Sequence, residues 1–144
     1  MIRDDIQKAI FTNLKEGKAM EVKVLRFILS EIKYAEIAKQ KDLTDEEAVA
    51  VLQKEVKKRK EAIEMFKKGE RFDLVTDEEA QLVIIAQYLP KQLPVEELNK
   101  IIDSVIAEIG DKSNMGKIIG AVMGRVKGQA DGSQVAQLVK QKLN

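Results

Sequence analysis

The chain has 144 residues, a formal net charge of +1, 44% hydrophobic residues, 34% charged residues and only 4% aromatic residues. It contains no cysteine and no histidine, which excludes disulfides, a thiol nucleophile, and imidazole as a general base or metal ligand. The near-neutral balance also argues against strong, indiscriminate nucleic-acid binding, so any such binding must come from a local patch.

Apolar residues in the first part of the chain recur with the three- and four-residue spacing of amphipathic helices. These stripes predict three helices, over about residues 2–17, 18–40 and 45–69. Thr44 is expected to cap the third helix, because Glu47 stands three residues later as in a capping box. At about 1.5 Å per residue, the second and third helices each span roughly 35 Å and are predicted to form a long antiparallel hairpin.

The start of a fourth helix is left open by the sequence. The capping signal recurs at Thr76 and Glu79, so the helix can begin there. It can also begin earlier, after Gly69, and run through Leu74. With either start, Pro90 ends the helix, because the residue before a proline disfavours the α conformation.

The two prolines of the chain, Pro90 and Pro94, mark a boundary between subdomains. After Pro94, three apolar stripes predict a small three-helix bundle, and no segment alternates like a strand. The expected architecture is therefore all-α. An N-terminal helical part with the long hairpin, residues 1–90, precedes the bundle, residues 91–144.

Glycines recur every four residues from Gly116 to Gly132. Four steps of four residues drift by about 160° around a straight helix, so the five glycines cannot face one partner from it. Gly116, Gly120 and Gly124 are expected within a helix, and Gly128 and Gly132 in the connection and cap that follow. Three interior glycines cost a helix about 3 kcal/mol relative to alanine, so packing or a ligand must order it.

On a helical wheel these glycines fall on the polar side of the helix, next to Lys117 and Arg125, and Lys127 follows them. A bare backbone beside cations suits close approach by a sugar-phosphate chain. The four positions expected to allow this approach are Gly116, Gly120, Gly124 and Gly128. The alternative is that the first subdomain packs against the bare face.

The stretch from Met115 to Gly132, MGKIIGAVM followed by VKGQADG, resembles the signature of the GatB/YqeY family. Further matches are KxRKE at 57–61, RxDL at 71–74 and YLPKQL at 88–93, so the resemblance covers nearly the whole chain. It is closest to the free-standing YqeY-like proteins. Gly124 departs from the pattern, because many relatives have proline there.

The resemblance implies an all-helical fold whose bundle is similar to the tail of the tRNA-dependent amidotransferase B subunit. That tail touches transfer RNA during glutamine-dependent amidation, while the catalytic steps occur on other domains. The resemblance therefore implies a tRNA-binding accessory module, related to this family of carbon–nitrogen ligases, without an active site of its own.

The candidate tRNA contacts are Lys117, Arg125 and Lys127 by resemblance, and Lys140 and Lys142 by charge alone. Residues 111–144 contain six basic and two acidic residues, which makes a modest phosphate-contacting patch credible. A second basic patch comprises Lys57, Lys58, Arg59 and Lys60. Glutamates four residues after Lys57 and Lys60 partly neutralise it, so a solvated helix face is the main interpretation and a second RNA surface the alternative.

No catalytic residue, metal site or cofactor is predicted. The G-x5-G-K run from Gly110 to Lys117 is one residue too long for a P-loop and lacks the hydroxyl that holds magnesium. Without a Cys–His pair, glutamine hydrolysis by that route is impossible, and independent catalysis is not expected.

The main alternative to RNA binding is a protein-interaction adaptor that binds an aminoacyl-tRNA synthetase or an amidotransferase subunit. The charged residues Arg3, Asp4 and Asp5 stand where a signal peptide has an apolar core, and no run is long enough to span a membrane. The sequence therefore predicts a cytoplasmic protein with no membrane association.

Overall fold

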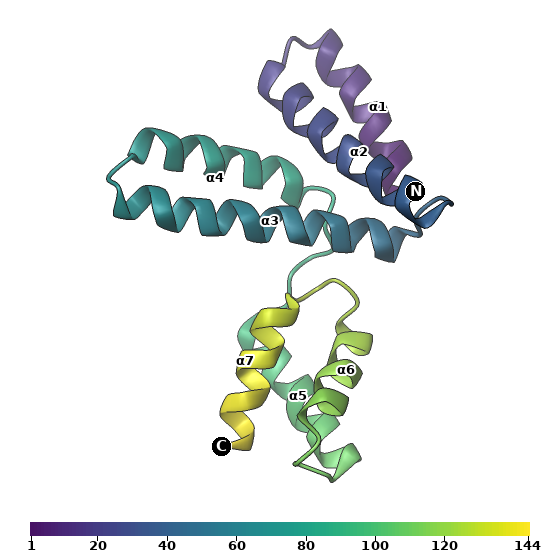
Figure 1. Ribbon diagram of the computed structural model, residues 1–144, viewed down its shortest axis with the longest axis vertical. Helices are drawn as coiled ribbons and strands as arrows, with labels where there is room; N and C mark the ends of the chain where they lie inside the picture. The colour runs from purple at the N-terminus through teal and green to yellow at the C-terminus, as the bar shows by residue number, and fades with distance from the viewer. The chain divides into compact units, whose positions relative to one another are not determined.

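The computed structural model describes residues 1–144, which form seven α-helices and no strand (Figure 1). The helices are α1 (Ile2–Lys15), α2 (Ala19–Lys39), α3 (Asp45–Lys68), α4 (Phe72–Ala86), α5 (Val95–Ile109), α6 (Met115–Val126) and α7 (Gly132–Leu143). The predicted all-α class is confirmed. The chain divides into two compact units, an N-terminal unit, Met1–Leu89, and a C-terminal unit, Pro90–Asn144. None of the helices combines the length and the apolar composition that crossing a bilayer requires.

The N-terminal unit consists of two helical hairpins, in which α1 packs along α2 and α3 packs along α4 (Figure 1). Helix α2 also contacts α3 and α4. One fully buried side chain from each helix illustrates the shared core: Ile6, Ile28, Leu52 and Ile85. Each helix therefore contributes one apolar stripe to a single core, as amphipathic helices do.

The predicted hairpin between the second and third helices is wrong. Helix α2 ends at Lys39, its C-cap Gln40 is left-handed with a φ of 62°, and α3 begins only after Thr44. Figure 1 shows the two helices diverging from this connection. The apolar stripes of α1 and α4 also need partners, so α2 pairs with α1 and α3 pairs with α4.

Helix α4 begins at Phe72, which is the earlier of the two starts that the sequence allows. Thr76 does not cap it, because the Thr76 hydroxyl lies inside the helix and donates a hydrogen bond to the carbonyl oxygen of Phe72 (3.0 Å). Thr44 forms the expected capping box with Glu47 at the start of α3. The residues just before the two threonines, Leu43 and Val75, are both buried, so the local pattern alone does not separate a cap from a residue inside a helix.

The C-terminal unit is a bundle of α5, α6 and α7 around its own core. Six fully buried residues, two from each helix, are Leu98, Ile102, Ile118, Val122, Val135 and Val139. The segment before α5 is tied to the α6–α7 connection by two hydrogen bonds. The backbone N–H of Leu93 donates to the carbonyl of Gln129 (2.8 Å), and Nε2 of Gln92 donates to the carbonyl of Gly128 (3.1 Å).

Candidate nucleic-acid interface

Helix α6 forms although three of its twelve residues are glycines. The Asn114 side chain caps its first turn by accepting a hydrogen bond from the backbone N–H of Lys117 (3.1 Å). Ile118, Val122 and Val126, spaced four residues apart, are fully buried in the bundle core. Burial of three branched side chains at about 1.5–3 kcal/mol each exceeds the cost of about 3 kcal/mol for the glycines. Tertiary packing therefore holds this helix.

The structure places Gly116, Gly120 and Gly124 on the exposed side of α6. A Cβ atom added at Gly120 or Gly124 would meet nothing within 4 Å, and one at Gly116 would meet only Oδ1 of Asn114, at 4.0 Å. At Gly120 and Gly124 the backbone therefore has no side chain in front of it within 4 Å. A ligand can therefore approach the backbone closely there.

Lys117 and Lys127 lie at the two ends of this glycine side, roughly 15 Å apart along the helix axis. Both side chains are exposed, and neither forms an ion pair within 4 Å. Lys127 adopts a left-handed conformation (φ 40°), and its N–H donates to the carbonyl of Met123 (3.1 Å), which ends α6. Gly128 follows at φ 83°, so the predicted placement of this glycine in the connection is observed.

Arg125 has a partner that the sequence did not suggest. Its guanidinium forms an ion pair with the Glu108 carboxylate and a hydrogen bond with the Ser104 hydroxyl (3.4 Å), both on α5. The side chains of Arg125 and Glu108 are 43% and 57% exposed, so water reaches the pair. A phosphate that binds Arg125 must compete with Glu108.

Lys142 on α7 is held in a similar way, by an ion pair with Asp103 of α5 (2.7 Å). Lys140 is exposed and forms no ion pair. Helix α7 runs back along α6, so the C-terminal end of α7 lies toward the end of the bundle where α6 begins (Figure 1). The five candidate cations are thus spread along the bundle, and three of them, Lys117, Lys127 and Lys140, are unpaired.

The second basic patch is divided between surface and interior. Arg59 is largely buried, with its side chain 11% exposed, and its guanidinium binds the buried carboxylate of Glu55 (2.8 Å). It also donates to Gln81 of α4 (3.2 Å) and lies 5.4 Å from the Phe27 ring of α2. Lys58 forms a second ion pair with Glu55 (3.4 Å). Arg59 therefore joins three helices and is not presented to a ligand.

The exposed lysines of that patch are Lys57, Lys58 and Lys60. Three acidic partners, Glu55, Asp103 and Glu108, were not singled out from the sequence. Glu55 lies four residues before Arg59, a spacing that signals a helical ion pair. No local signal exists for Asp103 and Glu108, because their partners are 39 and 17 residues away on other helices.

The start of α6 is lined by an ordered turn. The Ser113 hydroxyl and backbone N–H donate to the carboxylate of Asp111, and these bonds, with a smaller contribution from the charge of Lys117, lower the pKa of Asp111. No group of three or more acidic side chains is arranged to hold a metal ion. The candidate interface therefore consists of open backbone and flanking lysines.

The protein is all-helical and consists of two units. Its C-terminal bundle exposes the glycine-bearing side of α6 next to cations. The Yqey-like protein family matches residues 3–143, so the chain belongs to the YqeY-like family, and the resemblance noted in the sequence is confirmed. The YqeY domain occurs in free-standing YqeY proteins and in C-terminal tails of GatB.

Two fungal proteins are similar to this chain. An uncharacterized protein of Schizosaccharomyces pombe is 40% identical over 86 residues, which cover 60% of this chain and 70% of the relative. A protein of Pyrenophora tritici-repentis, named "Altered inheritance of mitochondria protein 41, mitochondrial", is 30% identical over 114 residues, which cover 76% of this chain and 62% of that protein. The match therefore spans less than two thirds of the second relative.

Proposed function

We propose that this protein is an accessory module that binds transfer RNA through its C-terminal bundle and has no active site of its own. The observation that carries this proposal is the open backbone at Gly120 and Gly124 between two unpaired lysines, Lys117 and Lys127. Phosphate contacts from lysine and from backbone groups position a protein on a nucleic acid without reading its sequence. Membership of the YqeY-like family supports this proposal, because the same domain occurs in the tail of a tRNA-dependent amidotransferase subunit.

The test is titration of labelled tRNA with the full chain by fluorescence anisotropy at several salt concentrations. Charge reversal of Lys117, Arg125 and Lys127 to glutamate should weaken binding at least about tenfold at ~0.15 M salt. The slope of log K against log salt should fall by about one for each phosphate that the variant no longer neutralises. Binding equal to that of the parent chain would show that this patch is not the contact surface.

A matched control carries the same change in net charge on the N-terminal unit. Lys8, Lys54 and Lys67 are exposed and form no ion pair, so their reversal to glutamate changes the charge without touching the bundle. The control should retain most of the affinity. An equal loss in both triple variants would mean that tRNA responds only to the total charge of the chain.

An accessory role also predicts that the purified chain does not hydrolyse glutamine, and ammonia release by the chain alone would contradict it. The carbon–nitrogen ligase chemistry belongs, in this proposal, to a partner subunit. We propose the cytoplasm as its location. The mitochondrial name of the Pyrenophora relative belongs to that protein and makes the mitochondrion the second compartment to examine by fluorescent tagging.

A protein-interaction adaptor is the second candidate function, and exposed apolar side chains on the N-terminal unit favour it. Tyr34, Ile37 and Met65 are 68%, 72% and 73% exposed. Capture of partners from lysate with and without ribonuclease separates the two functions. Partners such as a synthetase or an amidotransferase subunit that survive digestion support the adaptor, whereas partners lost on digestion are bridged by RNA.

A further inference from the structure

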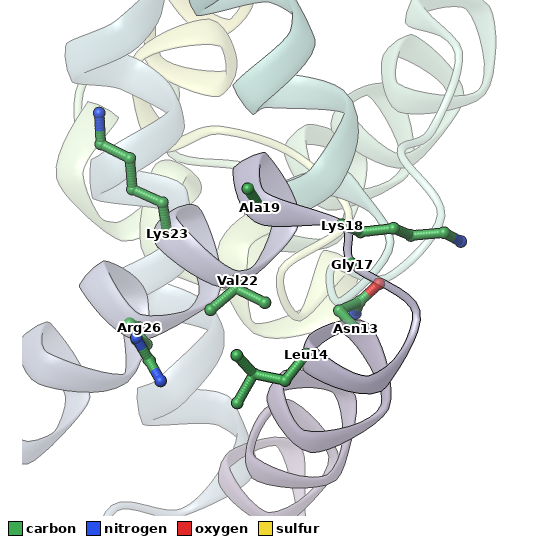
Figure 2. Close-up of a pocket in the computed structure, with 8 residues that line it drawn as sticks. All are labelled: Asn13, Leu14, Gly17, Lys18, Ala19, Val22, Lys23 and Arg26. Atoms are coloured by element: carbon green, nitrogen blue, oxygen red, sulfur yellow. The ribbon is translucent and has the colours of Figure 1, made fainter.

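The face that α1 and α2 share carries a hollow of about 490 Å³ at the turn between the two helices. Figure 2 shows the side chains of Leu14 and Val22 pointing toward each other, with the guanidinium of Arg26 beside them. Lys18 and Lys23 extend outward on opposite sides. Val22 is buried at 6% exposure and Leu14 is half exposed, so the hollow has an apolar floor and a cationic rim.

A second hollow, of about 350 Å³, lies farther along the same helix pair. Its lining includes Arg3 of α1 and Lys33 and Ile37 of α2. Ile37 is 72% exposed, so its side chain is available for contact with a partner. This hollow therefore also combines an apolar side chain with cations.

The two hollows lie on one face of α2. Val22, Arg26, Lys33 and Ile37 are spaced by four, seven and four residues, and at 100° per residue they fall within an arc of about 60°. Val22 and Ile37 are fifteen residues apart, which corresponds to about 22 Å along the helix axis. A helix of about four turns that lies along this face reaches both hollows.

The charge of this face is strongly one-sided. Six cationic residues and two acidic residues line the two hollows. Both acids, Glu36 and Asp42, are in contact with Arg3, at 2.8 and 3.5 Å. Lys18 is paired with Glu16 at 3.0 Å, outside the lining. The remaining cations, which form no ion pair within 4 Å, are Lys23, Arg26, Lys33 and Lys41.

The lining distinguishes between two kinds of anionic partner. Neither hollow is lined by an aromatic side chain, so bases of a single-stranded RNA would find no planar group on which to stack. Leu14, Val22 and Ile37 instead offer aliphatic contacts of the kind that receive leucine or isoleucine from an amphipathic helix. The unpaired cations between the hollows complement carboxylates.

We propose that the α1–α2 face docks an acidic amphipathic helix of a partner protein. Two apolar side chains of that helix, fifteen residues apart, occupy the hollows at Val22 and Ile37, and its carboxylates pair with Arg26 and Lys33. This surface is independent of the proposed RNA contact on the bundle. It gives the adaptor function a definite partner class.

The probe is a fluorescein-labelled synthetic helical peptide of about 18 residues, with leucines fifteen positions apart and glutamates on the same face between them. The control peptide has glutamine in place of both leucines and the same charge. In anisotropy titrations with the full chain, the leucine peptide should bind more tightly than the glutamine peptide. The double variant Arg26→Glu and Lys33→Glu should weaken its binding about tenfold, which is what two surface ion pairs supply together.

Lys54→Glu and Lys60→Glu on α3 make the matched control, because both side chains are exposed and form no ion pair. This variant should bind the leucine peptide like the parent chain. Circular dichroism checks that each variant stays helical. A further variant, Leu14→Gln, removes apolar contact without a change in charge, so this variant should also bind the leucine peptide more weakly. Equal binding of the two peptides, or equal loss in the control variant, overturns the proposal.

Two further measurements identify another occupant. If Arg26→Glu with Lys33→Glu abolishes tRNA binding and leaves peptide binding unchanged, the face is an RNA surface and the proposal is wrong. If light scattering shows that the parent chain is a dimer and the double variant a monomer, a second copy covers the face and the proposal is again wrong. Failure of the bundle variants to affect tRNA binding bears only on the RNA proposal.

Discussion

Two ion pairs between arginine and glutamate, one in each unit, differ strongly in exposure. In the N-terminal unit, the side chains of Glu55 and Arg59 are only 4% and 11% exposed. In the C-terminal unit, Arg125 and Glu108 are 43% and 57% exposed. Loss of one partner of a buried pair leaves an unpaired charge in the interior, whereas either partner of an exposed pair can turn to water or to another ion. The first pair therefore belongs to the fold, and the second is open to water and to competing ions.

The helix interiors show a parallel difference. No glycine lies inside α1, α2, α3 or α4, whereas α6 contains three, all exposed. An exposed glycine weakens a helix by about 1 kcal/mol relative to alanine and contributes no packing. The helices of the N-terminal unit thus expose no bare backbone of this kind, whereas α6 of the C-terminal unit leaves backbone accessible beside cations. The predictions below test this contrast.

Removal of the buried carboxylate should have the largest effect. Glu55→Ala leaves the largely buried Arg59 guanidinium without its carboxylate and should lower the free energy of unfolding by about 3–5 kcal/mol. Urea unfolding followed by circular dichroism measures this change in the free energy of unfolding. Glu61→Ala, at an exposed position of the same helix, should change stability by no more than about 0.5 kcal/mol.

The double variant Glu55→Leu with Arg59→Met tests the cause of that loss. Apolar residues of similar volume often replace a buried ion pair with little change in stability, so the double variant should regain most of the lost free energy. If it is as unstable as Glu55→Ala, the carboxylate matters for some reason other than pairing with Arg59.

The glycines of α6 should separate stability from binding. Neither Gly120 nor Gly124 has a positive φ, and an added Cβ meets nothing within 4 Å. Alanine at each position should therefore stabilise the protein by about 1 kcal/mol. The same alanines should weaken tRNA binding, because a methyl group then stands in front of the backbone.

Gly110 provides the opposite case. It ends α5 at φ 72°, where an L-residue is strained, so Gly110→Ala should destabilise by about 1–2 kcal/mol although the space around it is open. Thermal unfolding ranks the stability of the Gly110, Gly120 and Gly124 variants.

Unchanged tRNA affinity in the Gly120 and Gly124 variants would mean that RNA does not approach this side of α6.

The sequence predicted the helices well because their signals are local. Apolar spacing and the prolines locate all seven helices. The pairing of helices was not predictable in this way, since α2 has one apolar stripe and the spacing does not say whether α1 or α3 covers it. The two Thr-x-x-Glu motifs show the same limit, because the same local pattern begins a helix at Thr44 and lies inside one at Thr76.

These two threonines allow a direct test. Thr44→Ala removes a capping hydrogen bond to the N–H of Glu47 (3.2 Å) and should cost about 1 kcal/mol. Thr76→Ala removes only a bond to a carbonyl inside α4 and should change stability by less than about 0.5 kcal/mol. Urea unfolding compares the free energies of unfolding of the two variants. Equal losses would contradict the assignment of one threonine as a cap and the other as an interior residue.

The candidate site was less predictable than the fold. The sequence identified which cations lie near the glycines but not which of them are already paired. Arg125 and Lys142 meet acids of α5, and that proximity exists only after the bundle has formed. Long-range pairing of this kind leaves no periodic trace in the sequence.

The Arg125–Glu108 pair gives the next prediction. Glu108→Gln removes the competing carboxylate, so it should raise tRNA affinity about two- to fivefold, in line with the value of one exposed ion pair. Glu96→Gln is the control, because Glu96 lies on the same helix, is exposed and forms no ion pair. Both variants lose one negative charge. An equal gain in both would mean that Arg125 is not released by the substitution.

The smallest expected effect concerns the turn before α6, where hydrogen bonds from Ser113 are the main cause that lowers the pKa of Asp111. Ser113→Ala removes the hydroxyl bond and should raise the pKa of Asp111 toward its ordinary value. Because the folded pKa is the lower one, the ionised carboxylate stabilises the fold above the unfolded pKa, and this contribution is lost as the pH falls through the folded pKa.

Carboxyl carbon chemical shifts measured against pH by NMR follow this titration. Ser104→Ala should leave the Asp111 titration unchanged, because the Ser104 hydroxyl bonds to Glu108 and Arg125 instead.

In the N-terminal unit, the corresponding lowering of the Glu47 pKa comes first from a hydrogen bond with Lys39 of the neighbouring helix. High salt screens an ammonium but not a hydroxyl, so it should raise the pKa of Glu47 more than that of Asp111. Equal salt responses would mean that Asp111 owes its low pKa to Lys117 rather than to its own turn.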